Sequence, residues 1–177
     1  MTIDHPKTLY VSQEDFKWLL EYIEQEDEHL SPEAELDLKL REEVFQRAGV
    51  DEINRLIQQP DSELDGTFLG FLNVYEAART VASKNSTIID FGCHMAAQSY
   101  LFEDYAKYIG VDIIANLERF SPQNAEHYIM SIQDFIATHP ETVGDESIFA
   151  ICSYVPDSEA RKLVRQSYPN CLVYYPH

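Results

Sequence analysis

The chain has 177 residues, close to the usual size of one domain, and 45% of them are hydrophobic, so a folded protein with a sizeable core is expected. Asp and Glu number 31 against 13 Lys and Arg, a net charge of −18, and such an acidic surface disfavours direct nucleic-acid binding. No apolar run reaches the roughly 18 residues of a membrane span and no signal-peptide pattern opens the chain, so a cytoplasmic protein without membrane association is expected.

Residues 1–83 have helical periodicity and predict an N-terminal helical region with four helices. The first helix is expected to begin at Ser12. Ser31-Pro32 is a typical start for the second, because serine caps helices and proline suits the first helical position, and Gly49 suits its end. The fourth segment, residues 67–82, is apolar on most sides and predicts a buried helix that packs on the rest of the chain.

The acidic residues are concentrated in the same part of the chain. Residues 1–66 contain 18 Asp/Glu and 6 Lys/Arg, a net charge of −12, against 13 and 7, or −6, in residues 67–177. The run EQEDE at 24–28 has the pattern of a solvated helix face. The alternative interpretation is an acidic face that binds a basic partner protein or imitates nucleic acid.

Residues 84–177 alternate short apolar runs with helical stretches. The predicted strands are 87–92, 108–113, 127–132, 147–155 and 170–176, and the predicted helices are 95–107, 133–139 and 156–168. The run SIFAICSYV (147–155) is uncharged, as in a central parallel strand that is buried on both faces. This pattern predicts an α/β fold, a Rossmann-like and mostly parallel sheet of about five strands, with the N-terminal helical region packed on it as one globular unit.

The turn after the first strand is the leading candidate for a binding site, since ligands of such sheets bind beyond the carboxyl ends of the strands. The stretch IIDFGC places Asp90 and Gly92 in this turn, and a glycine allows a ligand close to the backbone. Asp112 ends the second strand, 22 residues after Asp90, which is near the spacing of nucleotide-binding βαβ units. An acid at this point can accept hydrogen bonds from ribose hydroxyls.

IIDFGC followed by YIGVDI resembles the class I S-adenosylmethionine-dependent methyltransferases, whose first motif is an apolar strand running into Asp-x-Gly-x-Gly-x-Gly. The resemblance covers roughly residues 86–177. It implies S-adenosylmethionine as the cofactor, with Asp90 and Gly92 in the first motif and Asp112 on the ribose. It also implies an adenine contact at Asp134 and Phe135, and a substrate-facing strand end in SIFAICSYVPD, where Tyr154 and Pro156 would line the substrate pocket.

The sequence departs from that family at the cofactor loop and beyond it. His94 and Ala96 replace the second and third glycines, and the His94 imidazole could occupy the space of the methionine part of the cofactor. The stretch Ser153-Tyr154-Val155-Pro156 is not the signature of amino-group methyltransferases, and the sequence has two strands fewer than the family usually has. These departures predict a protein that keeps the fold with weakened or lost catalysis.

Each candidate residue also has a purely structural interpretation. Asp90 suits helix capping or loop hydrogen bonds, and Ser131 followed by Asp134 suits helix capping. Tyr154 suits aromatic packing. The three cysteines, Cys93, Cys152 and Cys171, lack the spacing of metal ligands, so we expect reduced thiols and no metal site.

Three functional hypotheses follow. The first is an S-adenosylmethionine-binding, methyltransferase-like protein, which would be a methyltransferase if it is active. The second is a catalytically silent relative, or pseudoenzyme, that uses the fold as a binding module. The third is a non-catalytic acidic protein that binds a basic partner and uses the sheet as a scaffold.

Overall fold

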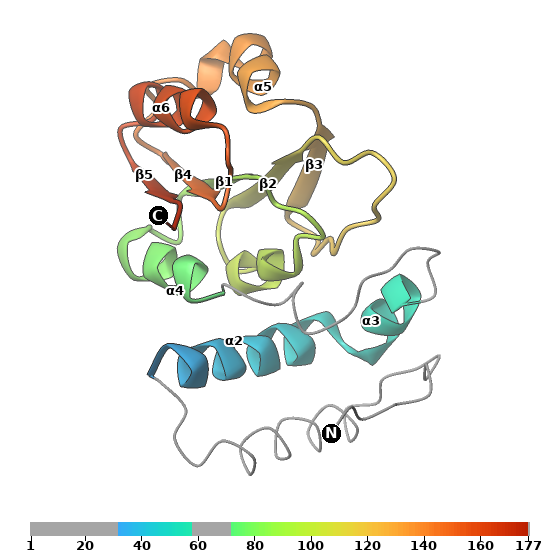
Figure 1. The fold of residues 1–177 in the computed structure, drawn as a ribbon. Coiled ribbons are helices and arrows are strands. Elements are labelled where there is room, and N and C mark those ends of the chain that lie inside the picture. Colours follow the sequence, from blue (N-terminus) through green and yellow to red (C-terminus); the bar gives the residue numbers. More distant parts are fainter. Residues whose placement is uncertain (1–31, 58–71, 177) are drawn as a thin grey trace.

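A computed structural model describes residues 32–57 and 72–176 (Figure 1). The predicted helix from Ser12, the acidic run 24–28 and the start of the predicted fourth helix lie outside the described residues. The strands are β1 (Thr87–Phe91), β2 (Lys107–Asp112), β3 (Ala125–Ile129), β4 (Ile148–Ser153) and β5 (Cys171–Tyr174). The α-helices are α2 (Pro32–Ala48), α3 (Val50–Ile57), α4 (Leu72–Val81), α5 (Ile132–Thr138) and α6 (Ser158–Ser167), and the 3₁₀ helices are η1 (Ala97–Phe102) and η2 (Pro140–Thr142).

The five strands form one parallel sheet in the order β3-β2-β1-β4-β5. The chain moves outward from β1 through β2 to β3, and then returns to the other side of β1 for β4 and β5. The predicted Rossmann-like α/β fold is therefore confirmed. The strand order reverses between β1 and β4, and in open α/β sheets this is where ligands bind.

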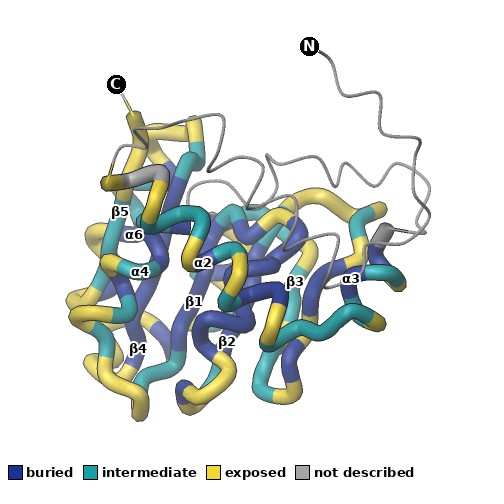
Figure 2. The backbone as a smooth tube through the Cα atoms, turned by 90° about the horizontal axis from the view of Figure 1, so that it is seen from below, coloured by how far each residue is buried: buried dark blue, intermediate teal, exposed yellow. Residues whose placement is uncertain are grey.

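Helices cover both faces of the sheet. Helices α5 and α6 lie on one face, while α4 and η1 lie on the other, with α2 beyond them (Figure 1). The side chains of β1 point alternately to the two faces of the sheet, as in any strand. Ile88 packs with α4 and η1 on one face, whereas Ile89 and Phe91 pack with α5 and α6 on the other. The central strands are accordingly buried along most of their length (Figure 2).

The described N-terminal helices pack on the α4 side of the sheet. Helix α2 contacts α4 and η1. The Arg79 guanidinium donates to both carboxylate oxygens of Glu43 at 2.9 and 3.0 Å, and Arg47 Nη1 donates to the backbone oxygen of Tyr100 at 3.2 Å. These bonds tie α2 to α4 and η1, which pack on the sheet. None of the described helices combines the length and the apolar composition that crossing a membrane requires.

The connection between β1 and β2 differs from the sequence-based expectation. The predicted helix 95–107 is replaced by the six-residue η1 and turns, and Ala96 precedes η1 in the left-handed conformation with φ 57°. Every residue of η1 is buried, with Tyr100 edge-on to Phe120 and Phe102 edge-on to Tyr105. Burial on all sides fixes this segment by tertiary packing, which overrides the helical periodicity of its sequence.

Candidate functional site

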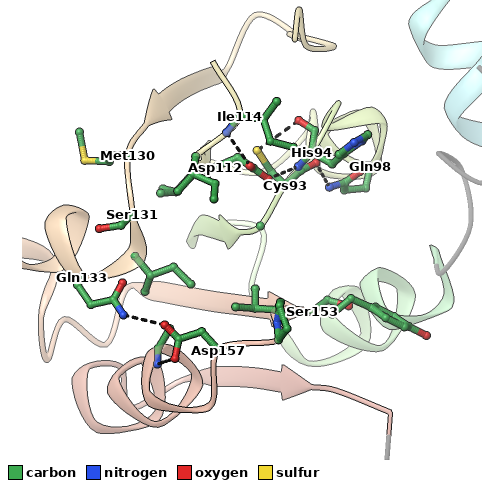
Figure 3. Close-up of a pocket in the computed structure, with 18 of the residues that line it drawn as sticks. Cys93, His94, Gln98, Asp112, Ile114, Met130, Ser131, Gln133, Ser153 and Asp157 are labelled. Carbon is green, nitrogen blue, oxygen red and sulfur yellow. Dashed lines mark hydrogen bonds between the residues drawn. The ribbon is translucent and has the colours of Figure 1, made fainter. Parts of the chain in front are cut away.

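A cavity of about 700 Å³ opens at the carboxyl ends of β1, β2, β3 and β4 (Figure 3). Its volume falls within the range of about 300–1,000 Å³ that is typical of ligand pockets. Its lining includes Tyr75, Gly92, Cys93, His94, Gln98, Asp112, Ile113, Ile114, Met130, Ser131, Ile132, Gln133, Ser153, Tyr154, Val155, Pro156 and Asp157. Five of the eight site residues predicted from the sequence are among them: Gly92, His94, Asp112, Tyr154 and Pro156.

The turn after β1 forms the floor of this cavity. Gly92 has φ 78°, a left-handed conformation, and its backbone N–H donates to the oxygen of Val111 at 2.8 Å. A Cβ at Gly92 would lie 2.9 Å from Val155 Cγ2. Glycine is therefore needed at position 92 for two reasons: it adopts the left-handed conformation without strain, and it leaves room for the loop after β4.

Strained backbone is concentrated around the cavity. The non-glycine residues with positive φ among the described residues are His94 at 49°, Ala96 at 57° and Tyr154 at 58°. His94 and Tyr154 line the cavity, and Ala96 lies in the loop that joins His94 to η1. Such conformations cost about 1–3 kcal/mol each and cluster at functional sites, so their location supports a binding role for this edge of the sheet.

Asp112 is held in a fixed orientation at the end of β2. Its Oδ2 accepts a hydrogen bond from the backbone N–H of His94 at 2.9 Å, and its Oδ1 accepts one from the N–H of Ile114 at 3.0 Å. An ionised carboxylate has about four lone-pair sites, so two acceptor positions remain for a ligand. The bond to His94 also ties the end of β2 to the turn after β1.

His94 does not close the cavity. Its side chain is exposed, and the cavity of about 700 Å³ is present with the imidazole in its lining. Figure 3 shows His94 beside Asp112 and Gln98, across the cavity from Gln133 and Asp157. The departure from the glycine loop at this position therefore leaves room for a ligand.

The end of β4 forms a second wall. The Tyr154 backbone N–H donates to the oxygen of Tyr174 at 2.9 Å, and the two rings lie edge to face at 5.4 Å between centroids. Ser153 is 5% exposed, and its Oγ has no hydrogen-bond partner among the described residues. A buried hydroxyl without a partner is uncommon, because leaving it unsatisfied costs about 1–3 kcal/mol.

The starts of α5 and α6 form the opposite wall. Ser131 caps α5 by accepting from the N–H of Asp134 at 3.0 Å, and Asp157 caps α6 by accepting from the N–H groups of Glu159 and Ala160. Gln133 Nε2 donates to Asp157 Oδ2 at 3.1 Å and so links the two helix starts. The capping interpretation of Ser131 is confirmed.

Asp90 lies beneath the cavity. It is fully buried and does not line the cavity, but it accepts hydrogen bonds from two residues that do, Tyr75 at 3.2 Å and Gln98 at 2.8 Å. The Tyr108 hydroxyl is its third donor. Burial raises the pKa of the Asp90 carboxyl to about 6, and the hydrogen bonds from Tyr108, Gln98 and Tyr75 oppose that shift.

The two residues predicted to contact adenine lie outside the cavity lining. Phe135 is fully buried against the sheet, where its ring is edge-on to Phe91 and Tyr128 and stacked on His139 at 4.2 Å between centroids. Asp134 is exposed at the start of α5. The neighbouring residues Ser131, Ile132 and Gln133 line the cavity in their place.

Several lining residues were not predicted from the sequence, although some carry a signal. Gln98 and its neighbour Ser99 are the two polar residues in the mostly apolar stretch from Met95 to Phe102, and Gln98 is 6% exposed, which suggests a specific hydrogen-bonding role. Asp157 follows a proline and precedes a helical pattern, as an N-cap residue does. Tyr75 and Gln133 have no comparable sequence signal.

The charges of the lining restrict the chemistry of a ligand. The lining contains the carboxylates of Asp112 and Asp157 and neither lysine nor arginine. Burial raises the pKa of the Cys93 thiol far above its ordinary value and that of Cys152 to about 12, so neither thiol supplies a thiolate nucleophile. Among the described residues no three His, Cys, Asp or Glu side chains are grouped as a metal ion would require.

Gly92→Ala is expected to destabilise the protein more than Gly144→Ala. Both glycines have φ near 77°, so both substitutions carry the left-handed cost of about 1–2 kcal/mol. Only the new Cβ at position 92 meets a neighbour, because nothing lies within 4 Å of the one at Gly144. The free energies of unfolding in urea measure the difference, and equal losses would show that Val155 moves away without cost.

Comparisons of the chain with protein-family models, with curated proteins and with solved structures find no match.

Proposed function

We propose that this protein binds S-adenosylmethionine in the cavity, as a methyltransferase-like protein whose catalysis is weakened or lost. The observation that carries the proposal is Asp112, an oriented carboxylate with unused acceptor positions at the end of β2. It borders a ligand-sized cavity at the point where the strand order reverses. Ribose hydroxyls are the donors that suit this carboxylate.

The rest of the nucleoside would lie on the apolar part of the lining. Ile113 and Ile114 follow Asp112 directly and are 72% and 40% exposed, and Met130 and Ile132 face the same cavity after β3. Apolar side chains on both sides of a carboxylate suit a flat base next to a ribose. The adenine would thus contact these residues, and the methionine part would extend over Gly92 and His94.

The charge of the cavity favours this ligand over nucleotides that carry phosphate. A phosphate site ordinarily uses lysine, arginine or the start of an α-helix after β1. The lining contains neither cation, β1 is followed by a short 3₁₀ helix, and at the starts of α5 and α6 the Ser131 and Asp157 side chains already accept from the backbone N–H groups. A sulfonium cation, in contrast, is attracted by the carboxylates of Asp112 and Asp157.

Methyl transfer would require an acceptor in line with the sulfonium methyl, and catalysis of this kind depends mainly on positioning. Tyr154 and Pro156, at the end of β4, are the residues that would border an acceptor. The imidazole and carboxylate groups of the lining belong to His94, Asp112 and Asp157, and none of them forms a dyad with a side-chain nucleophile among the described residues. We therefore propose binding of the cofactor, with methyl transfer weakened or lost.

The melting temperature of the full chain tests the proposal. A ligand at 100 times its Kd stabilises the folded state by about 2.7 kcal/mol, which corresponds to a rise of roughly 5–11 °C for a protein of this size. S-adenosylmethionine and S-adenosylhomocysteine should raise the melting temperature, and NAD and ATP should not. No rise with millimolar S-adenosylhomocysteine would contradict the proposal and favour the acidic scaffold, for which the net charge of −18 is the only support.

A further inference from the structure

The buried network around Asp90 connects the interior of the protein with the cavity. Tyr75 from α4 and Gln98 from η1 both line the cavity, and both donate to the Asp90 carboxylate, at 3.2 and 2.8 Å. Tyr108 from β2 is the third donor. No cation is among these partners, so three neutral donors compensate the buried charge.

The Gln98 side-chain amide is held by hydrogen bonds from its Nε2 group. Its Nε2 donates to Asp90 Oδ2 and to the backbone oxygen of Cys93 at 2.9 Å, with a longer contact of 3.3 Å to the Tyr75 hydroxyl. The two acceptors dictate the orientation of the amide, because Oε1 in the place of Nε2 would face two oxygens. All three of these contacts use Nε2, and Gln98 is more than nine-tenths buried.

We propose that Asp90 is a positioning residue for the ligand: its carboxylate orients the Gln98 amide and the Tyr75 hydroxyl, so that ligand binding requires the ionised form of Asp90. The inference rests on the proposed function, since the ligand is the nucleoside assigned to the cavity. When Asp90 takes up a proton, its carboxyl group becomes a donor itself and no longer needs the Gln98 N–H. The Gln98 amide then loses one of the two contacts that dictate its orientation toward the cavity.

The surroundings of Asp90 favour proton uptake in an accessible pH range. Burial raises the pKa of Asp90 to about 6 against the pull of its three donors. Asp112 on β2 adds a raising contribution, and the other titratable groups facing Asp90 are Tyr75, Tyr108, Cys93 and Cys152. Burial raises the pKa of each of these hydroxyls and thiols, so they stay uncharged while Asp90 titrates.

The pH dependence of S-adenosylhomocysteine binding tests the inference. If only the ionised form binds, the apparent Kd rises as the ionised fraction falls, which is about tenfold between pH 7.5 and pH 5 for a group with a pKa of about 6. Calorimetric titration of the full chain should show this rise, and Asp90→Asn should weaken binding at pH 7.5 and remove the rise. A Kd that is constant from pH 5 to 7.5 would overturn the inference while the proposed function stands.

Two further variants separate Asp90 from its neighbours. Histidine is the side chain that ordinarily changes charge between pH 5 and 8, so His94 is the alternative source of a pH-dependent Kd. If Asp90 is the source, the His94→Gln variant keeps the tenfold rise in Kd. Asp134→Asn, which alters an exposed carboxyl outside the lining, must also keep it. Loss of the rise in His94→Gln would assign the pH dependence to His94 and overturn the inference.

A measurement on the unmodified protein covers the case in which Asp90→Asn does not fold. The carbon-13 signal of the Asp90 carboxyl reports its titration midpoint, and by linkage a ligand that prefers the ionised form must lower that midpoint. Saturation with S-adenosylhomocysteine should therefore shift the midpoint downward from about 6. An unchanged midpoint would overturn the inference, whereas no binding at any pH would instead contradict the proposed function.

Discussion

Phe135→Ala is expected to lower the free energy of unfolding by about 3–5 kcal/mol, the range for truncating a buried phenylalanine. Phe135 is fully buried, and its ring contacts Phe91, Tyr128 and His139 between α5 and the sheet. The substitution leaves a cavity in the core on the α5 side. Denaturation in urea, followed by circular dichroism, measures the loss.

Asp134→Ala is the matched control, because Asp134 is the next residue and is exposed. Its effect on stability should stay within about 0.5 kcal/mol, as for most surface substitutions. The pair also tests the adenine contact that the sequence predicts at these two positions. A small loss of stability in Phe135→Ala, together with weaker nucleoside binding, would indicate that Phe135 contacts the ligand and would contradict its purely structural role.

Asp112→Ala is expected to weaken S-adenosylhomocysteine binding by roughly 10- to 100-fold. Hydrogen bonds to a charged acceptor contribute about 1.5–3 kcal/mol, and each 1.4 kcal/mol corresponds to a factor of ten in Kd. The substitution also removes the acceptor of the His94 and Ile114 backbone N–H groups, so the end of β2 loses its connection to the turn after β1. Calorimetric titration measures the change in affinity.

Asp112→Asn separates the two consequences of that change. The amide keeps one oxygen that can accept from a backbone N–H, but it offers fewer acceptor positions for ribose. We expect an intermediate loss of affinity with a melting temperature close to that of the unmodified protein. Unchanged affinity in Asp112→Ala would show that Asp112 does not bind the ribose.

The fold class, a mostly parallel sheet of about five strands with helices between them, could be predicted because it follows from local patterns. Short apolar runs separated by helical stretches favour parallel strands, and an uncharged run such as Ile148–Ser153 suits a strand that helices cover on both faces. Asp112 was predictable for the same reason, since the end of the second strand lies at the binding edge in any fold of this order. Its position depends on topology and not on contacts.

The role of Asp90 could not be predicted from the spacing of residues in the sequence. Asp90 lies on the same face of β1 as Ile88, where Tyr75 and Tyr108 approach it, and these partners come from α4 and β2. The sequence shows the carboxylate but not the three donors that surround it. For Phe135 a signal was present, because it follows Ile132 by three residues, the spacing of one buried helix face.

The helix expected at 95–107 shows how packing overrides periodicity. The aromatic residues Tyr100 and Phe102 suit a helix face in the sequence, but they are buried between the sheet and α2 in a 3₁₀ segment that a left-handed Ala96 begins. The short segment leaves Gln98 beside the cavity, within reach of Asp90. The polar network beneath the cavity, formed by Tyr75, Asp90 and Gln98, therefore results from contacts between residues that are distant in the sequence.

Isothermal titration of the full chain with S-adenosylhomocysteine at pH 7.5 measures directly whether the cavity binds this nucleoside. We expect saturable binding to one site, with an affinity that falls in Asp112→Ala and is retained in Asp134→Ala. The absence of binding heat at millimolar ligand, or equal affinity in all three proteins, would contradict the assignment of the cavity to this nucleoside.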